Sequence, residues 1–527
     1  SMTTMLVQSG TTIENQLSNL DHYAMGAGIE DLAGIARGRL GVVVSAGPSL
    51  RRNLEVLARP GVRDRCAIVA TQTTLRPLLD AGIAPHFVTA LDYHVISSRF
   101  YEGLDPAALE DTELVIDSRV NRAVTEAWPG RIRCIPSTQL DEFLGPLARG
   151  GSRLQASTTV AHLAYTFARH LGCDPVALIG QDLGFTDGLY YAPGTAIHEV
   201  WLPELNSFNT VETMEWERIV RHRNHLSERH DVNGRRIFTD AQMLNYLQSF
   251  EVRFAEDVRQ GLRIVDATEG GVRKRNTEVR TLVETIEAHA GAATSAIDFP
   301  RATVPEAGDR RAVLDRLALV RSELDEIAEA SDRTLEILER MLECQSDRPE
   351  MDRLFQRLEA PRATVRRHSD SRRLTDWFNQ IATFQRLRAD RRIRLAGDLE
   401  PIDRQRAELE RDIVNVRWAR DASRMLGDLL QSAGRLVTDG VFESRLGDSA
   451  RLTDAMGVDV LPTVEPKVVA VVPIDPHQGG LGVDRGLAAN LAGRSILQRT
   501  LERIDAVSGI AAIALLVPEG FDVESAV

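Results

Sequence analysis

The stretch LGVVVSAGPSL at residues 40–50 joins an uninterrupted apolar run to a turn of small residues and proline. Such a run is typical of a strand covered on both faces of a parallel sheet. The turn precedes a helical pattern, and free N–H groups at a helix start attract anions. The stretch predicts a first strand with a candidate phosphate site at its end, although an ordinary turn stays the alternative for the loop alone. It is neither a Walker loop nor a dinucleotide fingerprint, because Gly-Lys-Ser/Thr and GxGxxG are absent.

Similar apolar runs recur along the next 220 or so residues, with helical patterns between them. They lie at residues 67–70, 86–90, 114–117, 131–135, 176–179 and 262–265. Strands alternating with helices predict a doubly wound, mostly parallel, Rossmann-like α/β domain over residues 40–295. Residues 1–39 are a lead-in to this domain.

Long helices are predicted for residues 300–450. Apolar residues recur there at spacings of three, four and seven, namely Leu314, Leu317, Leu324, Ile327, Leu335, Leu338 and Met341. This pattern predicts a helical domain with solvated charge, and a protein-docking surface is the alternative. Ten arginines lie between residues 361 and 395, interrupted by Asp370, Asp376 and Asp390, which favours an intramolecular or protein contact over nucleic acid.

One βαβ unit is predicted for residues 463–527, with strands at 468–473 and 511–517 and a helix at about 495–507. A glycine-rich loop at 479–482 follows its first strand. About sixty residues are too few for a doubly wound domain. We expect either the start of a domain whose remainder is cut away, or a unit that packs onto a neighbour.

Composition excludes several classes of protein. The chain has 527 residues, 63 basic against 76 acidic, which leaves no global basic field for nucleic acid. Its four cysteines form no CxxC, so neither a disulfide framework nor a zinc site is expected. No apolar run reaches the roughly 18 residues of a membrane span, and the start lacks a signal-peptide layout. These features predict a soluble, cytoplasmic protein.

Polar residues follow several of the predicted strands. Open α/β sheets bind ligands at the carboxyl ends of their strands, and an acid beside an amide and tyrosines suits a sugar or nucleotide. For the acid alone, helix capping or loop closure is the alternative. The residues at these ends, including one helix start, are Thr71, Gln72, Asp92, Thr158, Gln181, Asp182, Tyr190 and Tyr191.

Several motifs together resemble the motility accessory factor (Maf) glycosyltransferases. They are Gly47-Pro48-Ser49-Leu50, Leu91-Asp92, Gly180-Gln181-Asp182-Leu183 with Tyr191, residues 239–251, and Ala267-Thr268-Glu269-Gly270-Gly271. Maf proteins are implicated in transferring nonulosonic (sialic-acid-like) sugars from CMP donors to Ser/Thr of flagellin. Their core is similar to bacterial sialyltransferases and, distantly, to archaeal pterin diphosphokinases. The resemblance covers residues 40–290 and extends to the long helices.

The resemblance implies a donor site and a metal-independent transfer that uses no cofactor beyond the CMP-sugar. The donor-binding residues would be Gly47, Pro48, Ser49, Thr71, Gln72, Asp92, Thr158, Gln181, Tyr191, Thr268 and Gly270. The acceptor hydroxyl needs a base, for which the candidates are Asp182, His230 and Glu269. The implied partner is an acceptor protein, flagellin for example, docked by the helical domain, with no nucleic acid or membrane involved.

Two departures from the related families matter. Sialyltransferases keep a histidine four residues before a Thr-Asp pair, and this chain has Thr239-Asp240 with Arg235 at that position. Other histidines nearby are His198, His225 and His230. Maf proteins also carry a large N-terminal domain, where this sequence has about forty residues.

The C-terminal unit resembles the start of a sugar nucleotidyltransferase. The carrying residues are Asn490-Leu491-Ala492-Gly493-Arg494, with Arg485 and Arg494 where lysines are commoner. A degenerate, inactive domain is the alternative. For the whole chain two rival hypotheses stay open, a Mg-dependent diphosphokinase with Asp92 and Asp182 as the metal pair, and a non-catalytic assembly protein.

Overall fold

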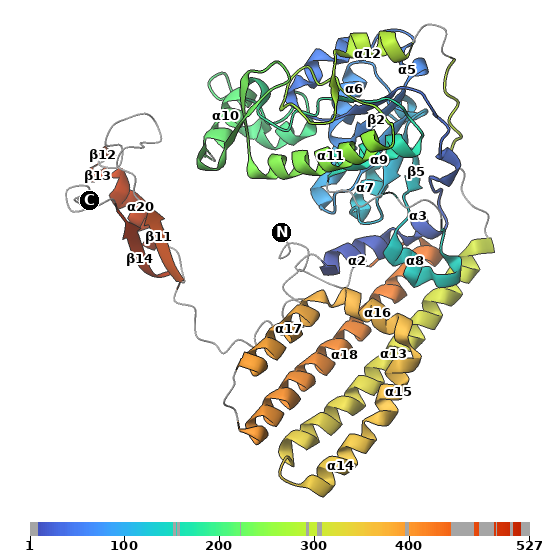
Figure 1. Ribbon diagram of the computed structural model, residues 1–527, viewed down its shortest axis with the longest axis vertical. Coiled ribbons are helices and arrows are strands. Elements are labelled where there is room, and N and C mark those ends of the chain that lie inside the picture. Colours follow the sequence, from blue (N-terminus) through green and yellow to red (C-terminus); the bar gives the residue numbers. More distant parts are fainter. Residues whose placement is uncertain are drawn as a thin grey trace. The chain divides into compact units, whose positions relative to one another are not determined.

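The computed structural model describes most of the chain in two compact units, Ser1–Leu452 and Thr453–Val527 (Figure 1). The described residues are 9–150, 154, 159–221, 223–290, 295–302, 308–395, 400–443, 468–473, 490–491, 493–505 and 510–517. Among them, no helix has the length and apolar character needed to cross a bilayer.

An eight-stranded parallel sheet forms the centre of the first unit, in the order β10-β9-β6-β1-β2-β3-β4-β5. Its strands are β1 (Gly41–Val44), β2 (Ala67–Thr71), β3 (Phe87–Ala90), β4 (Glu113–Ile116), β5 (Arg131–Cys134), β6 (Val176–Ile179), β9 (Ile264–Asp266) and β10 (Glu278–Val279). The register places Val42 opposite Ile68 on one side and Ala177 on the other. All seven strands that the apolar runs predict are confirmed; β10, two exposed residues long, was not predicted.

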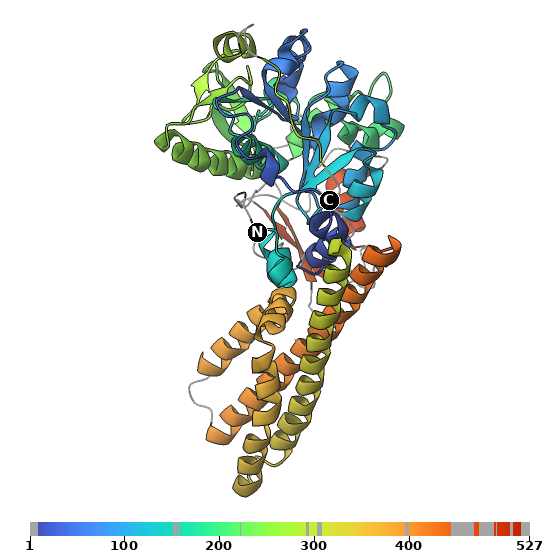
Figure 2. The same ribbon diagram turned by 90° about the vertical axis from the view of Figure 1, so that its right-hand side faces the viewer.

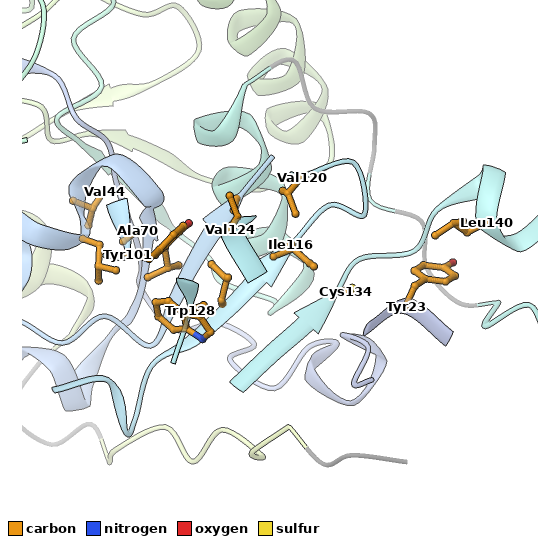
Figure 3. Close-up of a cluster of buried hydrophobic side chains, with 14 of the residues drawn as sticks. Tyr23, Val44, Ala70, Tyr101, Ile116, Val120, Val124, Trp128, Cys134 and Leu140 are labelled. Atoms are coloured by element: carbon orange, nitrogen blue, oxygen red, sulfur yellow. The ribbon is translucent and has the colours of Figure 1, made fainter. Parts of the chain in front are cut away.

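Both faces of the sheet are covered, which explains the uninterrupted apolar strands. Val42 and Val44 belong to one buried cluster and Val43 to another, because successive strand residues point to opposite faces. Figure 3 shows part of the first cluster, in which the rings of Tyr101 and Trp128 pack edge to face at 5.6 Å. The predicted doubly wound α/β class is therefore confirmed.

Helices connect the strands. Those of the α/β part are α2 (Ser9–Ser18), α3 (Leu20–Ala24), α4 (Leu54–Leu57), α5 (Val62–Arg65), α6 (Leu75–Asp80), α7 (Arg122–Ala127), α8 (Thr138–Leu144), α9 (Val160–His170), α10 (Val211–Arg221), α11 (Ala241–Arg259) and α12 (Leu282–His289). Thr159 caps α9, accepting from the backbone N–H of His162, at the predicted helix start. An antiparallel hairpin, β7 (Ser227–His230) and β8 (Arg236–Thr239), was not predicted, because its strands are polar and short.

The long helices form a bundle. They are α13 (Gly308–Glu343), α14 (Arg348–Arg357), α15 (Glu359–Arg367), α16 (Ser369–Phe378), α17 (Gln380–Leu395) and α18 (Pro401–Asp439), and α13 runs beside α18 in both views (Figures 1 and 2). The predicted apolar stripe is buried, except for Leu314, which is partly buried. In the arginine-rich stretch, Arg372 pairs with Asp376 and Arg373 with Asp370, each at 2.8 Å, so these charges are met within the chain.

The second unit contains the predicted strand–helix–strand arrangement. β11 (Val468–Pro473) pairs in parallel with β14 (Ile510–Leu516), and α20 (Ile496–Asp505) lies between them in sequence. A small antiparallel pair, β12 (Asn490–Leu491) and β13 (Arg494–Ser495), precedes α20. The predicted glycine-rich loop at 479–482, Arg485 and Ala492 lie outside the described residues. The assignment to a nucleotidyltransferase-like domain stays a prediction.

Leu324 and Leu319 of α13 offer a matched test of the bundle core. Leu324 is fully buried, whereas Leu319 is 51% exposed on the same helix. We expect Leu324→Ala to lower the free energy of unfolding by about 2–5 kcal/mol because it leaves a cavity. Leu319→Ala should change it by less than about 0.5 kcal/mol. Urea unfolding followed by circular dichroism measures both; equal effects would contradict the packing of α13.

Candidate functional site

The strand order has its switch point at the carboxyl ends of β1 and β6. β1 lies between β6 and β2, so the sheet is extended in opposite directions from this pair of strands. In open α/β sheets such a switch point is where ligands bind. The Gly47-Pro48-Ser49 turn follows β1, and Gln181 and Asp182 follow β6.

A hydrogen bond joins the two strand ends at this switch point. The Ser49 hydroxyl donates to Asp182 Oδ2 at 2.7 Å, and the Ser49 backbone N–H lies 3.3 Å from both carboxylate oxygens. The Thr186 hydroxyl donates to the other oxygen, Oδ1. All three residues are buried. Asp182 therefore holds the turn after β1 in place, and both donors of Ser49 face this carboxylate.

Three glycines make room for this contact. A Cβ on Gly47 would lie 2.0 Å from Asp182 Oδ2, and one on Gly271 would lie 2.4 Å from the Cα of Asp182. Gly180 has φ +62°, and a Cβ there would lie 2.0 Å from the Ser45 carbonyl oxygen. The glycines of the three predicted motifs are therefore needed for the same reason, which is the close approach of the segments that follow the strands.

Burial raises the pKa of Asp182 above its usual value. The hydrogen bonds from Thr186 and Ser49 and the charge of Lys274 act in the opposite direction but are smaller effects. A buried carboxylate that holds its proton more tightly has the property that a general base requires.

The end of β9 holds a fully buried ion pair. Lys274 Nζ lies 3.0 Å from Asp266 Oδ2, and the Thr268 hydroxyl donates to Asp266 Oδ1 at 2.5 Å. Thr268, predicted to contact the donor, therefore has its hydroxyl engaged inside the protein. Sequence reasoning missed this pair, although Lys274 is one of only two lysines in a chain with 61 arginines.

Glu269 and Gly270 lie against the turn after β1. Glu269 Oε1 accepts from Asn53 Nδ2 and from the backbone N–H of Leu282, both at 3.0 Å. A Cβ on Gly270 would lie 3.1 Å from both the Ser49 Cβ and Arg52 Nη1. The structure thus brings Gly270 to Ser49, and Glu269 bridges the segment after η2 (Pro48–Arg52) to α12.

The remaining predicted strand-end residues are mostly engaged with their neighbours. Gln181 Oε1 accepts from the Ser45 hydroxyl at 2.6 Å, and Gln72 Oε1 accepts from the Tyr101 hydroxyl at 3.2 Å. The Thr71 hydroxyl is buried and has no hydrogen-bond partner among the described residues. Asp92 accepts from the His94 N–H at 3.1 Å and from the Ser97 hydroxyl at 2.8 Å, so its carboxylate is bonded within the segment that follows β3.

The Tyr190–Tyr191 segment closes over the end of β1, where the Ala192 N–H donates to the Ala46 carbonyl at 2.8 Å. Arg218 lies over the Tyr190 ring at 4.5 Å. Burial raises the pKa of Tyr191 above its usual value. Beneath the segment, the fully buried Glu215 accepts from the Tyr190 N–H at 2.9 Å and pairs with His198 at 2.8 Å. Sequence reasoning missed Glu215 and Arg218, which belong to the separate helix α10 and follow no predicted strand.

His230 lies apart from these contacts. It is exposed on β7, and only its backbone carbonyl is tied to the site region, by the Arg273 N–H at 3.0 Å. In the nearby Thr239-Asp240 pair, the Thr239 hydroxyl donates to the Leu183 carbonyl and Asp240 caps α11. Thr158 lies outside the described residues. In the described part of the chain, no three His, Cys, Asp or Glu side chains gather as metal ligands would.

Comparisons with known proteins found a family model and a solved structure to which this chain is similar. The model of the 6-hydroxymethylpterin diphosphokinase MptE-like family matches residues 14–188, about a third of the chain. The matched residues cover the first part of the α/β domain. No curated protein matches the sequence. A solved structure of the MAf glycosyltransferase from Magnetospirillum magneticum AMB-1 aligns with 85% of this chain at 17% identity, with a TM-score of 0.46; the chain spans 62% of that protein.

Gly47→Ala tests the close approach at the switch point. The added methyl group would overlap the Asp182 carboxylate and the Gly180 carbonyl, so we expect the melting temperature to fall by several degrees. Gly434→Ala in α18 is the matched control, because a Cβ there meets nothing within 4 Å and should leave the melting temperature unchanged or higher. Similar melting temperatures for the two variants would show that the turn is loosely packed.

Asp182→Asn tests the raised pKa. The folded chain binds this proton more tightly than the unfolded chain, whose carboxyl has a pKa near 3.8. Stability from this group is therefore present at low pH and falls as pH rises from 3.8 through the raised pKa. We expect the wild type to lose stability relative to Asp182→Asn over that rise, measured by urea unfolding at a series of pH values.

Asp187→Asn supplies the comparison, because the pKa of Asp187 is shifted in the opposite direction to that of Asp182. Partial burial raises the pKa of Asp187, but hydrogen bonds and charge from Arg52 and Arg51 outweigh it and lower the pKa overall. The wild type should then lose stability relative to Asp187→Asn as pH falls below about 4. The same trend with pH for both pairs would contradict the environments described here.

Proposed function

We propose that the chain is a metal-independent glycosyltransferase that moves a nonulosonic sugar from a CMP donor to a Ser/Thr hydroxyl of a protein. The observation that carries this proposal is the Gly47–Ser49 turn bonded to Asp182 at the switch point of a parallel sheet. The turn and Asp182 stand where open α/β sheets bind their ligands, and sugar transfer needs the departing CMP to be stabilised. The site would act on a co-substrate and needs no resident cofactor.

Three side chains are proposed for the base that accepts the acceptor proton. Asp182 has the raised pKa but both of its oxygens accept hydrogen bonds. Glu269 is half-buried beside Asn53 and uses Oε1 for two hydrogen bonds. His230 is exposed on β7. The burial and position of Asp182 favour it over the other two.

The bundle and the second unit have proposed roles as well. We assign docking of the acceptor protein, flagellin for example, to the helices α13–α18. The second unit would belong to a nucleotidyltransferase-like domain that prepares the CMP-sugar. We propose a cytoplasmic location for both steps.

A Mg-dependent diphosphokinase is the second candidate, favoured by the family match to residues 14–188. It would need paired carboxylates to hold the metal beside the phosphates. Asp92 and Asp182, the pair considered from the sequence, each accept hydrogen bonds from hydroxyl and backbone groups of their own surroundings. This arrangement favours the transferase over the diphosphokinase. A non-catalytic assembly protein is the third candidate.

Calorimetric titration of CMP, with and without magnesium, tests the proposal. We expect metal-independent binding that weakens about tenfold or more in Ser49→Ala and Asp182→Ala, because each removes one side of the contact that shapes the turn. Ser331→Ala is the control, since its buried hydroxyl donates to the Ile327 carbonyl within the bundle. Binding of ATP only with magnesium would favour the diphosphokinase, and no nucleotide binding the assembly protein.

A further inference from the structure

A sugar donor that carries a phosphate and a carboxylate brings negative charge to the switch point. The Gly47–Ser49 turn itself offers little positive charge to balance it. Both donors of Ser49 point at Asp182, which is itself an acid, and Pro48 has no N–H. The balancing charge must come from side chains next to the turn.

Arg51 and Arg52 provide that charge. They end the 3-10 helix η2, two and three residues after Ser49. Arg52 is held in place, because its Nη1 donates to the Glu269 carbonyl and lies beside Gly270. Planar guanidinium groups bind phosphate and carboxylate oxygens strongly. The two arginines therefore stand close to the switch point, where open α/β sheets bind the anionic groups of their ligands.

A carboxylate of the chain already occupies this position. Asp187 Oδ2 lies 2.6 Å from Arg51 Nη2 and 2.8 Å from Arg52 Nη2, so one oxygen receives both guanidinium groups. Asp187 has a left-handed backbone at φ 56°, in the short helix η7 (Thr186–Gly188). Its side chain is 37% exposed, and those of Arg51 and Arg52 are 51% and 34% exposed. Exposed ion pairs are weak, so a ligand with greater negative charge can displace this carboxylate.

The geometry points to an anion subsite formed by Arg51 and Arg52, in which Asp187 stands in for the phosphate or carboxylate of the donor and is displaced when the donor binds. The inference rests on the proposed function for the identity of the donor. The subsite itself depends only on a phosphate or carboxylate ligand, so its test can succeed or fail separately.

The test compares wild type, Asp187→Asn, Arg52→Gln and Asp315→Asn by calorimetric titration. Asp315→Asn is the matched control, because Asp315 forms an exposed pair with Arg311 at 3.0 Å in α13 of the bundle. The ligands are CMP and cytidine, which differ by the phosphate, N-acetylneuraminic acid, which carries only a carboxylate, and inorganic pyrophosphate. Circular dichroism melting checks that each variant is folded.

We expect Asp187→Asn to bind CMP about three- to tenfold more tightly than wild type, because the competing charge is gone. Arg52→Gln should bind CMP at least threefold more weakly than wild type. Neither substitution should change the affinity for cytidine, and Asp315→Asn should have the affinities of the wild type. A gain for N-acetylneuraminic acid in place of CMP would support the subsite and assign it to the carboxylate. Asp187→Asn binding no anion more tightly than wild type would overturn it.

Failure of the proposed function is a separate result. If the wild type binds no CMP, the glycosyltransferase proposal fails, and the pyrophosphate titrations then decide the subsite alone. Tighter pyrophosphate binding by Asp187→Asn and weaker binding by Arg52→Gln would keep the subsite for another phosphate ligand. Equal pyrophosphate affinities, or none in any variant, would overturn the subsite too.

Discussion

The contact between Ser49 and Asp182 is the constraint that holds the strand ends at the switch point together. It ties the end of β1 to the end of β6 where the two halves of the sheet diverge. Losing the Asp182 carboxylate would leave the buried Ser49 hydroxyl without its acceptor, at a cost of about 1–3 kcal/mol. The segment after β9 is joined to it as well, because the Val272 N–H donates to the Asp182 carbonyl at 2.8 Å. Three strand ends are therefore held by one residue.

The hydrophobic core extends from the sheet into the bundle. Val42 and Ile116 of the sheet share one cluster with Leu317 of α13 and Leu426 of α18. A second cluster, farther along the bundle, contains Leu338 and Leu409 and has no sheet residue. The near ends of the long helices are thus part of the α/β core, whereas the far ends depend on one another.

Local patterns predicted the elements well and the roles of side chains less well. The strands around Val43 and Leu178 are apolar throughout, so their burial follows from the sequence itself. Asp92 and Thr268 lie at strand ends, as expected, but the sequence could not show that Asp92 bonds to Ser97 and Thr268 to Asp266. Such partners are set by contacts between distant segments. Arg52 was overlooked, although it stands three residues after Ser49.

The scarcity of lysine has a practical consequence for chemistry on this protein. Lys274 is fully buried on Asp266, and the other lysine, Lys467, lies outside the described residues. Among the described residues, a reagent that acylates amines finds no exposed lysine while the α/β domain is folded. Labelling at Lys274 then requires that the segment after β9 separate from β6. The extent of acylation at this one position would therefore measure how often this segment opens locally.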